Sequence, residues 1–333
     1  MNTGRGRSAW ILALLVPAFF LLALFIGRYG VRVGEAFRAL FSIGDVTDVV
    51  RALILRVRLP RALAAACVGA NLAVAGAAFQ GLFRNPLVDS RILGVSSGAA
   101  FGAAVALLLS AGTGGLQASA FVFGLVAVGL VCLIGLRFGS AALILVVGGI
   151  LVSALFNALL GLLKYVADPL SSLPAITYWL LGGLSDVRWS TLVPLLVVTG
   201  LGLLFFLAVR WRLNVLTLGE AEASVLGVRV RGFRAVVLLV GTLLVASSVA
   251  VGGIIGWIGL VVPHVARAWV GPNHGRMIPV SLGLGVLTLL VLDTIARTAL
   301  PSEIPLGVLT GLFGVPAFFL LFLRFLRTRG EAR

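Results

Sequence analysis

Few side chains in this chain of 333 residues could perform covalent chemistry. His264 and His274 stand ten positions apart without a third ligand type nearby, so they do not form the donor cluster that a zinc site needs. Cys67 and Cys132 are single thiols inside apolar runs, where cysteine usually packs as a small hydrophobic residue. The chain also lacks the phosphate-binding motif G-x-x-x-x-G-K-S/T and the zinc-protease motif H-E-x-x-H. We therefore predict no catalytic residue, no metal site and no enzyme activity.

A polar island at residues 218–228 lies between two long apolar runs and is flanked by arginines on both sides. Glu220 and Glu222 begin a segment of small and apolar residues that suits a short amphipathic helix, and Gly227 can end that helix. A short helix held between two long helices offers a mechanical contact to a soluble partner. We therefore expect residues 211–231 to form a loop that a second protein contacts.

The composition indicates that the elements around this island cross a membrane. Apolar residues make up 60% of the chain, charged residues make up 11%, and the mean hydropathy is +1.16, which excludes a soluble domain of ordinary composition. Because about 20 apolar residues cross the hydrocarbon layer, we predict an all-α polytopic membrane protein with ten spans in one domain, residues 1–333. The predicted spans are 9–27, 60–80, 92–110, 117–136, 141–163, 189–209, 233–251, 252–270, 278–297 and 306–326.

Three glycines separate the seventh predicted span from the eighth. Gly252, Gly253 and Gly256 interrupt an otherwise continuous apolar run. This interruption fits a tight reversal, or a broken helix buried among its neighbours, better than it fits one very long helix.

A second informative stretch runs from residue 58 to residue 103. In its first half, Gly69, Ala73, Gly76 and Ala77 form a small-residue face that lets helices approach closely within a membrane. The sequence then turns polar, and Pro86 keeps the residue before it out of helical geometry. Small residues from 94 to 102 begin the next span, so this loop suits a position against a pore axis.

An even number of spans places both termini on one side of the membrane. That side is predicted to be the cytoplasm, because cytoplasmic loops carry an excess of Lys and Arg and the C-terminus is basic. Ten of the 26 basic residues then face outward, and seven of those ten lie between residues 28 and 61. This segment is either an outward basic surface for an acidic partner or a sign of a misplaced span. The C-terminal basic residues are Arg324, Arg327, Arg329 and Arg333.

The net charge of +15 could point to nucleic acid as a partner. The arginines are instead scattered over the loops that flank the predicted spans, and the sequence holds no soluble basic domain or basic patch with interleaved aromatic residues. We therefore predict no nucleic-acid partner.

Two of these stretches resemble one family of membrane proteins. Residues 80–99 reproduce the pattern Q-G-L-F-x-N-P-L-x-x-x-x-x-L-G-V-S-S-G-A of the permeases of ATP-binding-cassette (ABC) importers that carry ferric siderophores, haem and cobalamin. The polar island resembles the cytoplasmic coupling loop of the same family, which has the pattern L-G-E-x-x-A-x-x-L-G. The matching coupling residues are Leu218, Gly219, Glu220, Ala223, Leu226 and Gly227.

Further motifs extend the resemblance over nearly the whole chain. Residues 256–267 resemble the segment G-x-x-G-L-V-x-P-H-x-x-R, and residues 271–276 resemble its D-H-R continuation. Asn273 stands where the family usually has Asp and Gly275 where it has Arg, which puts any charge contact there in doubt. Residues 303–316 resemble the E-L-P-x-G-x-x-T-x-x-x-G-x-P start of the last span. The order of these matches identifies the chain as a member of the family.

The resemblance implies the fold of a type II ABC importer permease and a set of partners. Two copies of the chain would surround a central pathway in the inner (plasma) membrane, with two ATPase subunits on the cytoplasmic side and a substrate-binding protein docked outside. The chain itself would hold no cofactor, because ATP and Mg²⁺ bind to the ATPase. Glu220 would act in mechanical contact with the ATPase and not as an acid or base.

The resemblance also makes the fifth predicted span a pore-lining helix, with its cytoplasmic end and the loop before the third span as the inner gate. Ordinary close packing of helices explains the serine and the glycines of this span equally well. The amides of Asn71 and Asn157, both inside spans, either face the pathway or bond to a neighbouring helix. The predicted gate and pathway residues are Asn85, Leu87, Leu143, Ile144, Ser153 and Asn157.

Three arginines at the outer ends of spans are predicted to dock the binding protein. Arg58 and Arg61 are three positions apart and would share one helix face, and Arg297 would complete the cluster. Guanidinium–carboxylate pairs between the two proteins would set their register. The alternatives are anchoring to lipid headgroups and, for Arg297, pairing with Asp293 one turn earlier. Residues 174–184 are predicted to form a short external helix that offers a platform to the same protein.

The resemblance thus implies an ATP-driven importer of an iron chelate, such as a ferric siderophore or haem, or of cobalamin. Iron chelates rank first because they are the commonest cargo of the family, and selectivity resides largely in the binding protein. The alternatives are a secondary transporter driven by an ion gradient and a membrane-embedded enzyme, both of which would work without an ATPase. A secondary transporter usually carries ionisable residues at membrane depth, and the predicted spans contain few.

Overall fold

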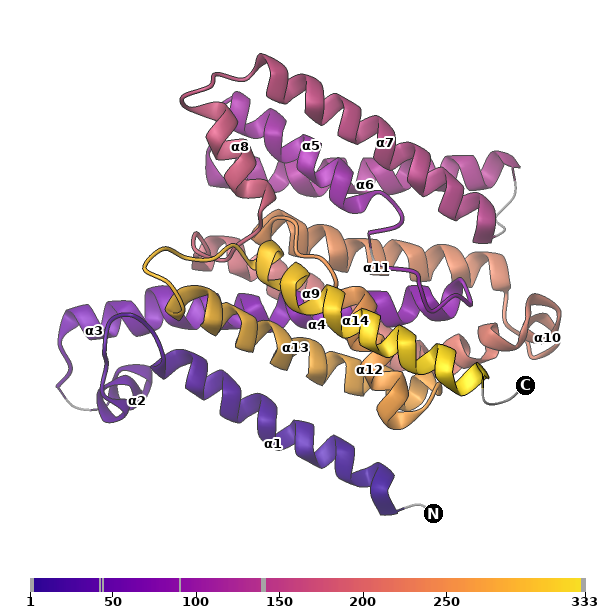
Figure 1. Ribbon diagram of the computed structural model, residues 1–333, viewed down its shortest axis with the longest axis horizontal. Coiled ribbons are helices and arrows are strands. Elements are labelled where there is room, and N and C mark those ends of the chain that lie inside the picture. Colours follow the sequence, from indigo (N-terminus) through magenta and orange to yellow (C-terminus); the bar gives the residue numbers. More distant parts are fainter. Residues whose placement is uncertain (1–2, 42, 44, 90, 139–141, 331–333) are drawn as a thin grey trace.

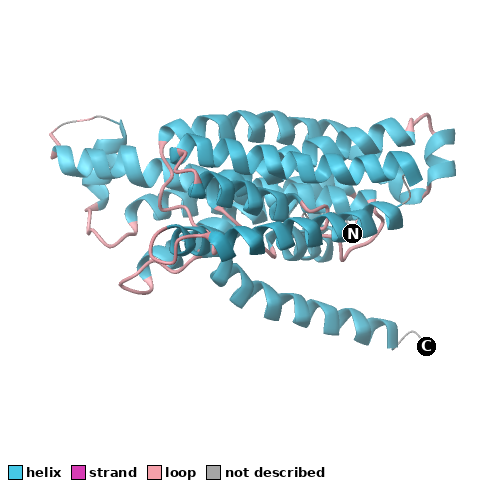
Figure 2. Cartoon of the chain, turned by 90° about the horizontal axis from the view of Figure 1, so that it is seen from above, coloured by secondary structure: helices cyan, strands magenta, loops and turns pink. Residues whose placement is uncertain are grey.

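The computed structural model describes the backbone of residues 3–41, 43, 45–89, 91–138 and 142–330. Side chains are described from residue 11 onward within these ranges, apart from residue 322 and residues 324–330. The C-terminal arginines that orient the chain, from residue 324 to residue 333, lie outside the described side chains. In the described part all regular structure is helical (Figures 1 and 2), which confirms the all-α fold class.

Ten helices coincide with the ten predicted spans. Six stretches are long and apolar enough to cross a membrane, and four other helices have a shorter apolar part of 10–17 residues. The structure thus confirms a polytopic membrane fold, while the number of crossings stays a prediction. The ten helices are α1 (Thr3–Phe25), α4 (Leu59–Leu82), α5 (Val95–Leu108), α6 (Gly112–Phe138), α7 (Ala142–Val166), α9 (Trp189–Leu218), α11 (Val230–Gly252), α12 (Ile258–Val270), α13 (His274–Thr298) and α14 (Leu306–Gly330).

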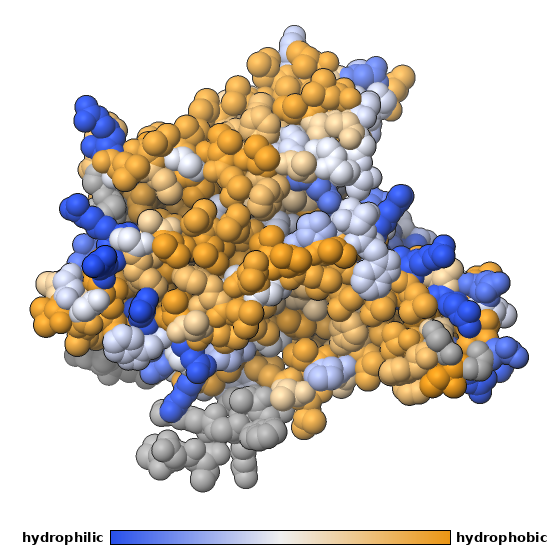
Figure 3. All heavy atoms as spheres, turned by 180° about the vertical axis from the view of Figure 1, so that it is seen from behind, coloured by the Kyte–Doolittle hydropathy of each residue, from blue (hydrophilic) through white to orange (hydrophobic). Residues whose placement is uncertain are grey.

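The remaining helices lie at the two ends of the bundle. α10 (Glu220–Val225) shares one end with the start of α1 and the end of α14 (Figure 1). α2 (Val33–Phe41), α8 (Ser172–Leu180) and α3 (Asp48–Ala52), which continues through the π-helix η1 (Leu53–Arg58) into α4, lie at the opposite end. On the face that Figure 3 shows, hydrophobic residues cover the middle and hydrophilic residues gather at both ends. Following the topology predicted from the sequence, we call the end with α10 the inner end and the opposite one the outer end.

The centre of the bundle is α4, of which 21 of the 24 residues are buried. Its glycines let other backbones touch it directly. A Cβ atom on Gly69 would collide with the carbonyl oxygen of Gly285 in α13, and one on Gly76 would collide with that of Gly259 in α12. This arrangement confirms the small-residue face predicted for the second span. Such close packing is a main source of attraction between helices in lipid.

The predicted interruption between the seventh and eighth spans is present. α12 begins six residues later than predicted, at Ile258, because residues 253–257 are not helical. Gly253 (φ 65°) and Trp257 (φ 69°) adopt left-handed conformations, which cost an L residue such as tryptophan roughly 1–2 kcal/mol. The N–H of Gly183 donates to the carbonyl of Gly252 at 2.9 Å, so the interruption is held against the loop that follows α8.

Helix α9 ends at Leu218, nine residues beyond the end predicted for its span. In this last part Arg210 and Arg212 are exposed, whereas Leu213 and Leu216 are buried against the bundle. The sequence prediction ended the helix at the first arginine. The alternation of exposed cations and buried leucines shows why it continues: an amphipathic helix can leave the apolar layer and still pack on its neighbours.

Filling the contact between α4 and α12 should destabilise the fold. Gly76→Leu would place a side chain where the Gly259 backbone now lies, and overpacking of this kind costs about 1–3 kcal/mol. Gly200→Leu in α9 is the matched control, because a Cβ atom there meets nothing within 4 Å. Thermal unfolding in detergent should give a lower midpoint for Gly76→Leu alone. Equal midpoints for the two variants would show that the close approach is not required.

Candidate functional site

The polar island folds into a short helix at the inner end, as its sequence predicts. Gly219 (φ 144°) separates α9 from α10, and Gly227 (φ 79°) follows the end of α10. Ala223 is fully buried against the bundle, whereas Val225 is 88% exposed. α10 therefore rests on one small residue and presents its other side outward. The structure brings together the six residues predicted for coupling, Leu218, Gly219, Glu220, Ala223, Leu226 and Gly227.

An ion pair fixes α10 to α11. Arg234 is largely buried, and its Nη2 atom lies 2.6 Å from Oε1 of Glu220. The hydrogen bond from Arg234 lowers the pKa of Glu220 below its ordinary value, so this carboxylate is charged at neutral pH. A lowered pKa means that the contribution of the pair to stability is present at neutral pH and is lost as the pH falls through the lowered value. The geometry makes Glu220 an anchor for α10.

A groove of about 480 Å³ runs beside the α4–α5 loop, the first turns of α5 and the middle of α7. Leu87 and Asn157, both predicted for the pathway, line this groove together with Ser96 and Ser97. Asn157 is exposed there, so its amide faces this groove, and its place on a transport pathway stays a prediction.

The other four predicted gate residues lie outside the lining of this groove. The Oδ1 atom of Asn85 accepts from the N–H of Leu87 at 2.9 Å, so this amide shapes the loop. Ser153 is half-buried where α7 packs against Gly94 at the start of α5. At the inner end of α7, the side chain of Leu143 is 74% exposed, and Ile144 beside it is half-buried.

Sequence reasoning missed a charged pair that also lines the groove. Nε of Arg91 lies 2.6 Å from Oδ2 of Asp89, so the two charges offset each other. The guanidinium carbon of Arg91 lies 5.8 Å from the ring centroid of Trp257, within the range of a cation–π contact. Arg91 thereby joins the α4–α5 loop to the interruption between α11 and α12. Two opposite charges two positions apart, in a loop between two apolar helices, were the available signal.

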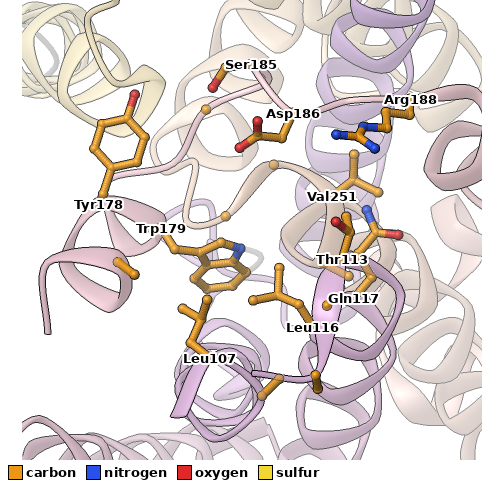
Figure 4. Close-up of a pocket in the computed structure, with 18 of the residues that line it drawn as sticks. Leu107, Thr113, Leu116, Gln117, Tyr178, Trp179, Ser185, Asp186, Arg188 and Val251 are labelled. Carbon is orange, nitrogen blue, oxygen red and sulfur yellow. The ribbon is translucent and has the colours of Figure 1, made fainter. Parts of the chain in front are cut away.

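A pocket of about 570 Å³ opens at the outer end between α8, the start of α6 and the end of α11. Leu107, Leu116 and Trp179 gather on one side of it, and Asp186 and Arg188 lie across from them (Figure 4). The external helix predicted for residues 174–184 is present here as α8, which begins two residues earlier and ends four residues earlier.

The structure corrects the expectation that Arg58, Arg61 and Arg297 form an exposed basic surface. Their exposed fractions are 4%, 7% and 8%. Arg61 pairs with Asp293 and with Glu303 of the α13–α14 loop, with 2.9 Å between nitrogen and oxygen in each pair. A buried guanidinium group needs such partners, and carboxylates of this chain supply them. Five other arginines of the segment 28–61 are exposed: Arg28, Arg32, Arg38, Arg51 and Arg56.

The same cluster ties α1 to the outer ends of α4 and α13. Arg297 Nε lies 3.3 Å from Asp293 Oδ2, as the alternative for this residue allows, and its Nη2 donates to the carbonyl of Ala23 at 2.7 Å. Arg58 Nη1 donates to the carbonyl of Leu24 at 2.9 Å. We call Arg58, Arg61, Asp293, Arg297 and Glu303 the outer charge cluster.

Asn71 bonds to neighbouring helices. Its Nδ2 donates to Oγ1 of Thr199 in α9 at 2.9 Å and to Oγ of Ser248 in α11 at 3.1 Å. The side chain is fully buried. The second alternative for this amide therefore holds, and the contact joins three helices in the middle of the bundle.

The two histidines serve as packing and hydrogen-bonding residues. Residues 94–98 match the G-x-S-x-G pattern of serine hydrolases. His264 and His274, however, bond to Leu260 and Asn214, and no hydrogen bond within the described residues joins either histidine to Ser96. Among the described residues, no group of three His, Cys, Asp or Glu side chains could hold a metal ion.

Known proteins match this chain over nearly its full length. The model of the FecCD transport family matches residues 14–324. The molybdate import system permease protein MolB of Haemophilus influenzae is 39% identical over 318 residues, which cover 93% of each chain. The hemin transport system permease protein HmuU of Yersinia pestis is 38% identical over 330 residues, which cover 96% of this chain and 97% of HmuU. A solved structure, described as an inward-facing conformation of a metal-chelate type ABC transporter, has a TM-score of 0.88 and 38% identity, and the match covers 96% of this chain and 99% of the other.

Removal of the shared carboxylate of the outer charge cluster should strongly destabilise the protein. Asp293→Leu would leave two buried guanidinium groups without it, and breaking a buried ion pair in this way costs roughly 3–5 kcal/mol. Asp186→Leu, which removes an exposed carboxylate at the same end, is the control. Thermal unfolding in detergent should separate the two variants clearly. An unfolding midpoint of Asp293→Leu equal to that of the wild type would contradict the stabilising role of Asp293 in the outer charge cluster.

Proposed function

Because the chain belongs to the FecCD transport family and is therefore the permease subunit of an ABC importer, we propose that it moves a metal chelate from an external binding protein into the cytoplasm. In this proposal two copies of the chain form the pathway in the inner (plasma) membrane, with both termini in the cytoplasm. ATP and Mg²⁺ bind to two separate ATPase subunits, and this chain holds no cofactor.

The exposed α10, which an ion pair and the buried Ala223 join to the bundle, is the observation that carries this proposal. Val225 is 88% exposed and Leu226 is 51% exposed, next to the charged Glu220. Apolar side chains on a projecting helix favour a partner that covers them. Ala223 and the ion pair to Arg234 join α10 to the bundle, so a force applied to this helix reaches α9 and α11. This is the arrangement that contact with a moving ATPase requires.

The outer charge cluster argues against the alternative of a secondary transporter. Such a protein needs an ionisable group that can exchange an ion or a proton within the membrane. Asp293 is 2% exposed and is held between the guanidinium groups of Arg61 and Arg297. A carboxylate with two cationic partners is a poor site for Na⁺ or for a proton, because binding either would leave a buried positive charge without its partner.

α7 and α14 are the helices that the second copy contacts in this proposal. α14 diverges from the other helices toward its C-terminal end (Figure 2), whereas Phe318 in its middle still contacts the ring of His264, with 5.5 Å between the ring centroids. Its Leu312 and Leu320 are 65% and 62% exposed, and Leu151 and Leu155 of α7 are 60% and 53% exposed. A second copy would cover part of these faces and turn the open groove beside α7 into a closed pathway.

The outer end provides the surface for the binding protein. Three arginines are buried in the outer charge cluster. The candidates for pairing with carboxylates of the binding protein are therefore the exposed arginines of α2, α3 and η1. The position of α8 beside the outer pocket supports its predicted use as a platform.

The cargo that we propose first is a ferric siderophore, followed by haem and cobalamin, and the similarity to MolB adds molybdate. The groove pairs its two charges with each other and otherwise offers hydroxyl, amide and apolar groups. Such a lining binds any one cargo weakly, and weak binding suits hand-over from a selective binding protein.

Uptake into vesicles tests the proposed function. Vesicles that contain this chain with its ATPase and binding protein should accumulate one of four compounds, ferric siderophore, haem, cobalamin or molybdate, only when ATP is trapped inside, because transport requires movement of α10 by the ATPase. Vesicles with a non-hydrolysable ATP analogue are the control. Accumulation that ignores ATP and follows an ion gradient would establish the secondary transporter instead.

A bulky substitution at the anchor of α10 should uncouple the transporter. Glu220→Trp removes the ion pair to Arg234 and alters the exposed face, so the ATPase should continue to hydrolyse ATP while uptake falls several-fold, in the range of typical coupling free energies of about 1–3 kcal/mol. Leu170→Trp, at a 93% exposed position of the outer end, is the control. Normal uptake by Glu220→Trp, measured together with ATP hydrolysis, would refute the coupling role.

A further inference from the structure

Asn214, close to the end of α9, bonds to the turn between α12 and α13. Its Nδ2 donates to Oδ1 of Asn273 at 3.1 Å, and its Oδ1 accepts from the backbone N–H of His274 at 2.7 Å. The Nδ1 atom of His274 lies 3.1 Å from the same oxygen. Oδ1 of Asn273 also accepts from the N–H of Gly275 at 2.8 Å and so caps α13. One amide on α9 therefore holds both the cap and the first residue of α13.

The ring of His274 extends this contact to the inner end of α4. His274 is 3% exposed and packs against the backbone of Gly81, where a Cβ atom would collide with its Nε2 atom. At the preceding position, Oε1 of Gln80 accepts from Nη2 of Arg267 in α12 at 2.9 Å. α4 ends one residue after Gly81 and passes into the loop that carries Leu87 to the groove.

We propose that Asn214 is a positioning residue for transport, which transmits a displacement of α10 through His274 to the α4–α5 loop at the groove. α9 runs without a break from Asn214 to its end, so a shift of α10 reaches this amide within roughly one helical turn. The contacts then continue from Asn214 to His274, from His274 to Gly81, and along the chain to Leu87. The inference rests on the proposed function, because it needs a partner that moves α10.

Two features make this contact suitable for transmitting motion. The amide of Asn214 engages a donor and an acceptor on α13 at once, which fixes direction as well as distance. The Gly81 backbone leaves no space between α4 and the imidazole, so a push on the ring must move α4. The uncharged Asn273 completes the arrangement without a charge contact at that position.

The first test compares variants in the complete transporter, reconstituted in vesicles with its ATPase and binding protein. Asn214→Leu removes every side-chain hydrogen bond and keeps the number and branching of the side-chain heavy atoms. Thr217→Val is the matched control on the same part of α9, because among the described residues its hydroxyl bonds to the Asn214 carbonyl alone. Asn273→Asp is the conservative variant, since a carboxylate keeps both acceptor roles. Cargo moved per ATP should fall roughly fivefold or more in Asn214→Leu, as for a typical allosteric coupling, and should stay near wild type in the other two.

A distance measurement separates transmission of motion from a loss of stability. Spin labels at Leu87→Cys report on the α4–α5 loop across the two copies, and labels at Glu222→Cys report on α10, both in a chain with Cys67→Ser and Cys132→Ser. In Asn214→Leu, ATP should still shift the distances between labels at position 222 but no longer shift those at position 87. Retention of both shifts, or loss of both, overturns the proposal.

Failure of this inference differs from failure of the proposed function. Wild-type cargo per ATP in Asn214→Leu would overturn the role of Asn214 and leave ATP-driven import intact. Absence of ATP-dependent uptake by the unmodified transporter would overturn the proposed function and the role of Asn214 together.

Discussion

The backbones of α12 and α13 touch the backbone of α4 at positions where a β-carbon would not fit. In lipid, helices gain little from hiding apolar side chains from one another, so close packing and interhelical hydrogen bonds must hold the bundle together. Close packing occurs where Gly69 meets Gly285 and where Gly76 meets Gly259. The interhelical hydrogen bonds are those that Asn71 makes to α9 and α11. Because these contacts fix α4 in the middle, they also determine what its two ends can reach.

The two ends of α4 are held by different chemistry. At the outer end, Arg61 pairs with two carboxylates in a buried cluster that strongly resists separation. At the inner end, Gln80 bonds to Arg267, and Gly81 meets the ring of His274 through van der Waals contact. The contacts at the inner end can be rearranged at a lower cost in free energy than the buried ion pairs at the outer end. The outer end of α4 is therefore held by buried ion pairs, and the inner end by one hydrogen bond to a cation and by packing.

The sequence predicts features that depend on local pattern. Apolar runs mark the helices, Gly219 and Gly227 bound α10, and the glycines near residue 252 mark the interruption before α12. Each of these features follows from the residue itself or from its near neighbours.

The burial and pairing of the outer arginines depend on residues that are far away in the sequence. Asp293 is 232 positions from Arg61, and Glu303 is 242 positions away, so a count of outward charges cannot show that they meet. Only packing of α4 against α13 turns an expected basic surface into a buried cluster. The hydrogen bonds of Asn214 to the start of α13 could not be predicted for the same reason. The pair of Asp89 and Arg91, in contrast, could have been predicted, because the two residues are two positions apart.

In the pathway that we propose, the lining of the groove favours movement over tight binding of the cargo as the driver of transport. A lone guanidinium group in this position would bind an anionic cargo strongly, and release would then limit turnover. Asp89 takes the Nε hydrogen bond of Arg91 and offsets its charge, while the ring of Trp257 covers part of the cation. The left-handed conformation of Trp257 places that ring where the α4–α5 loop and the interruption before α12 meet. A shift of the inner end of α4 would therefore change the contact between Asp89 and Arg91 and the shape of the groove together. Release of the cargo would then need no energy input other than this movement.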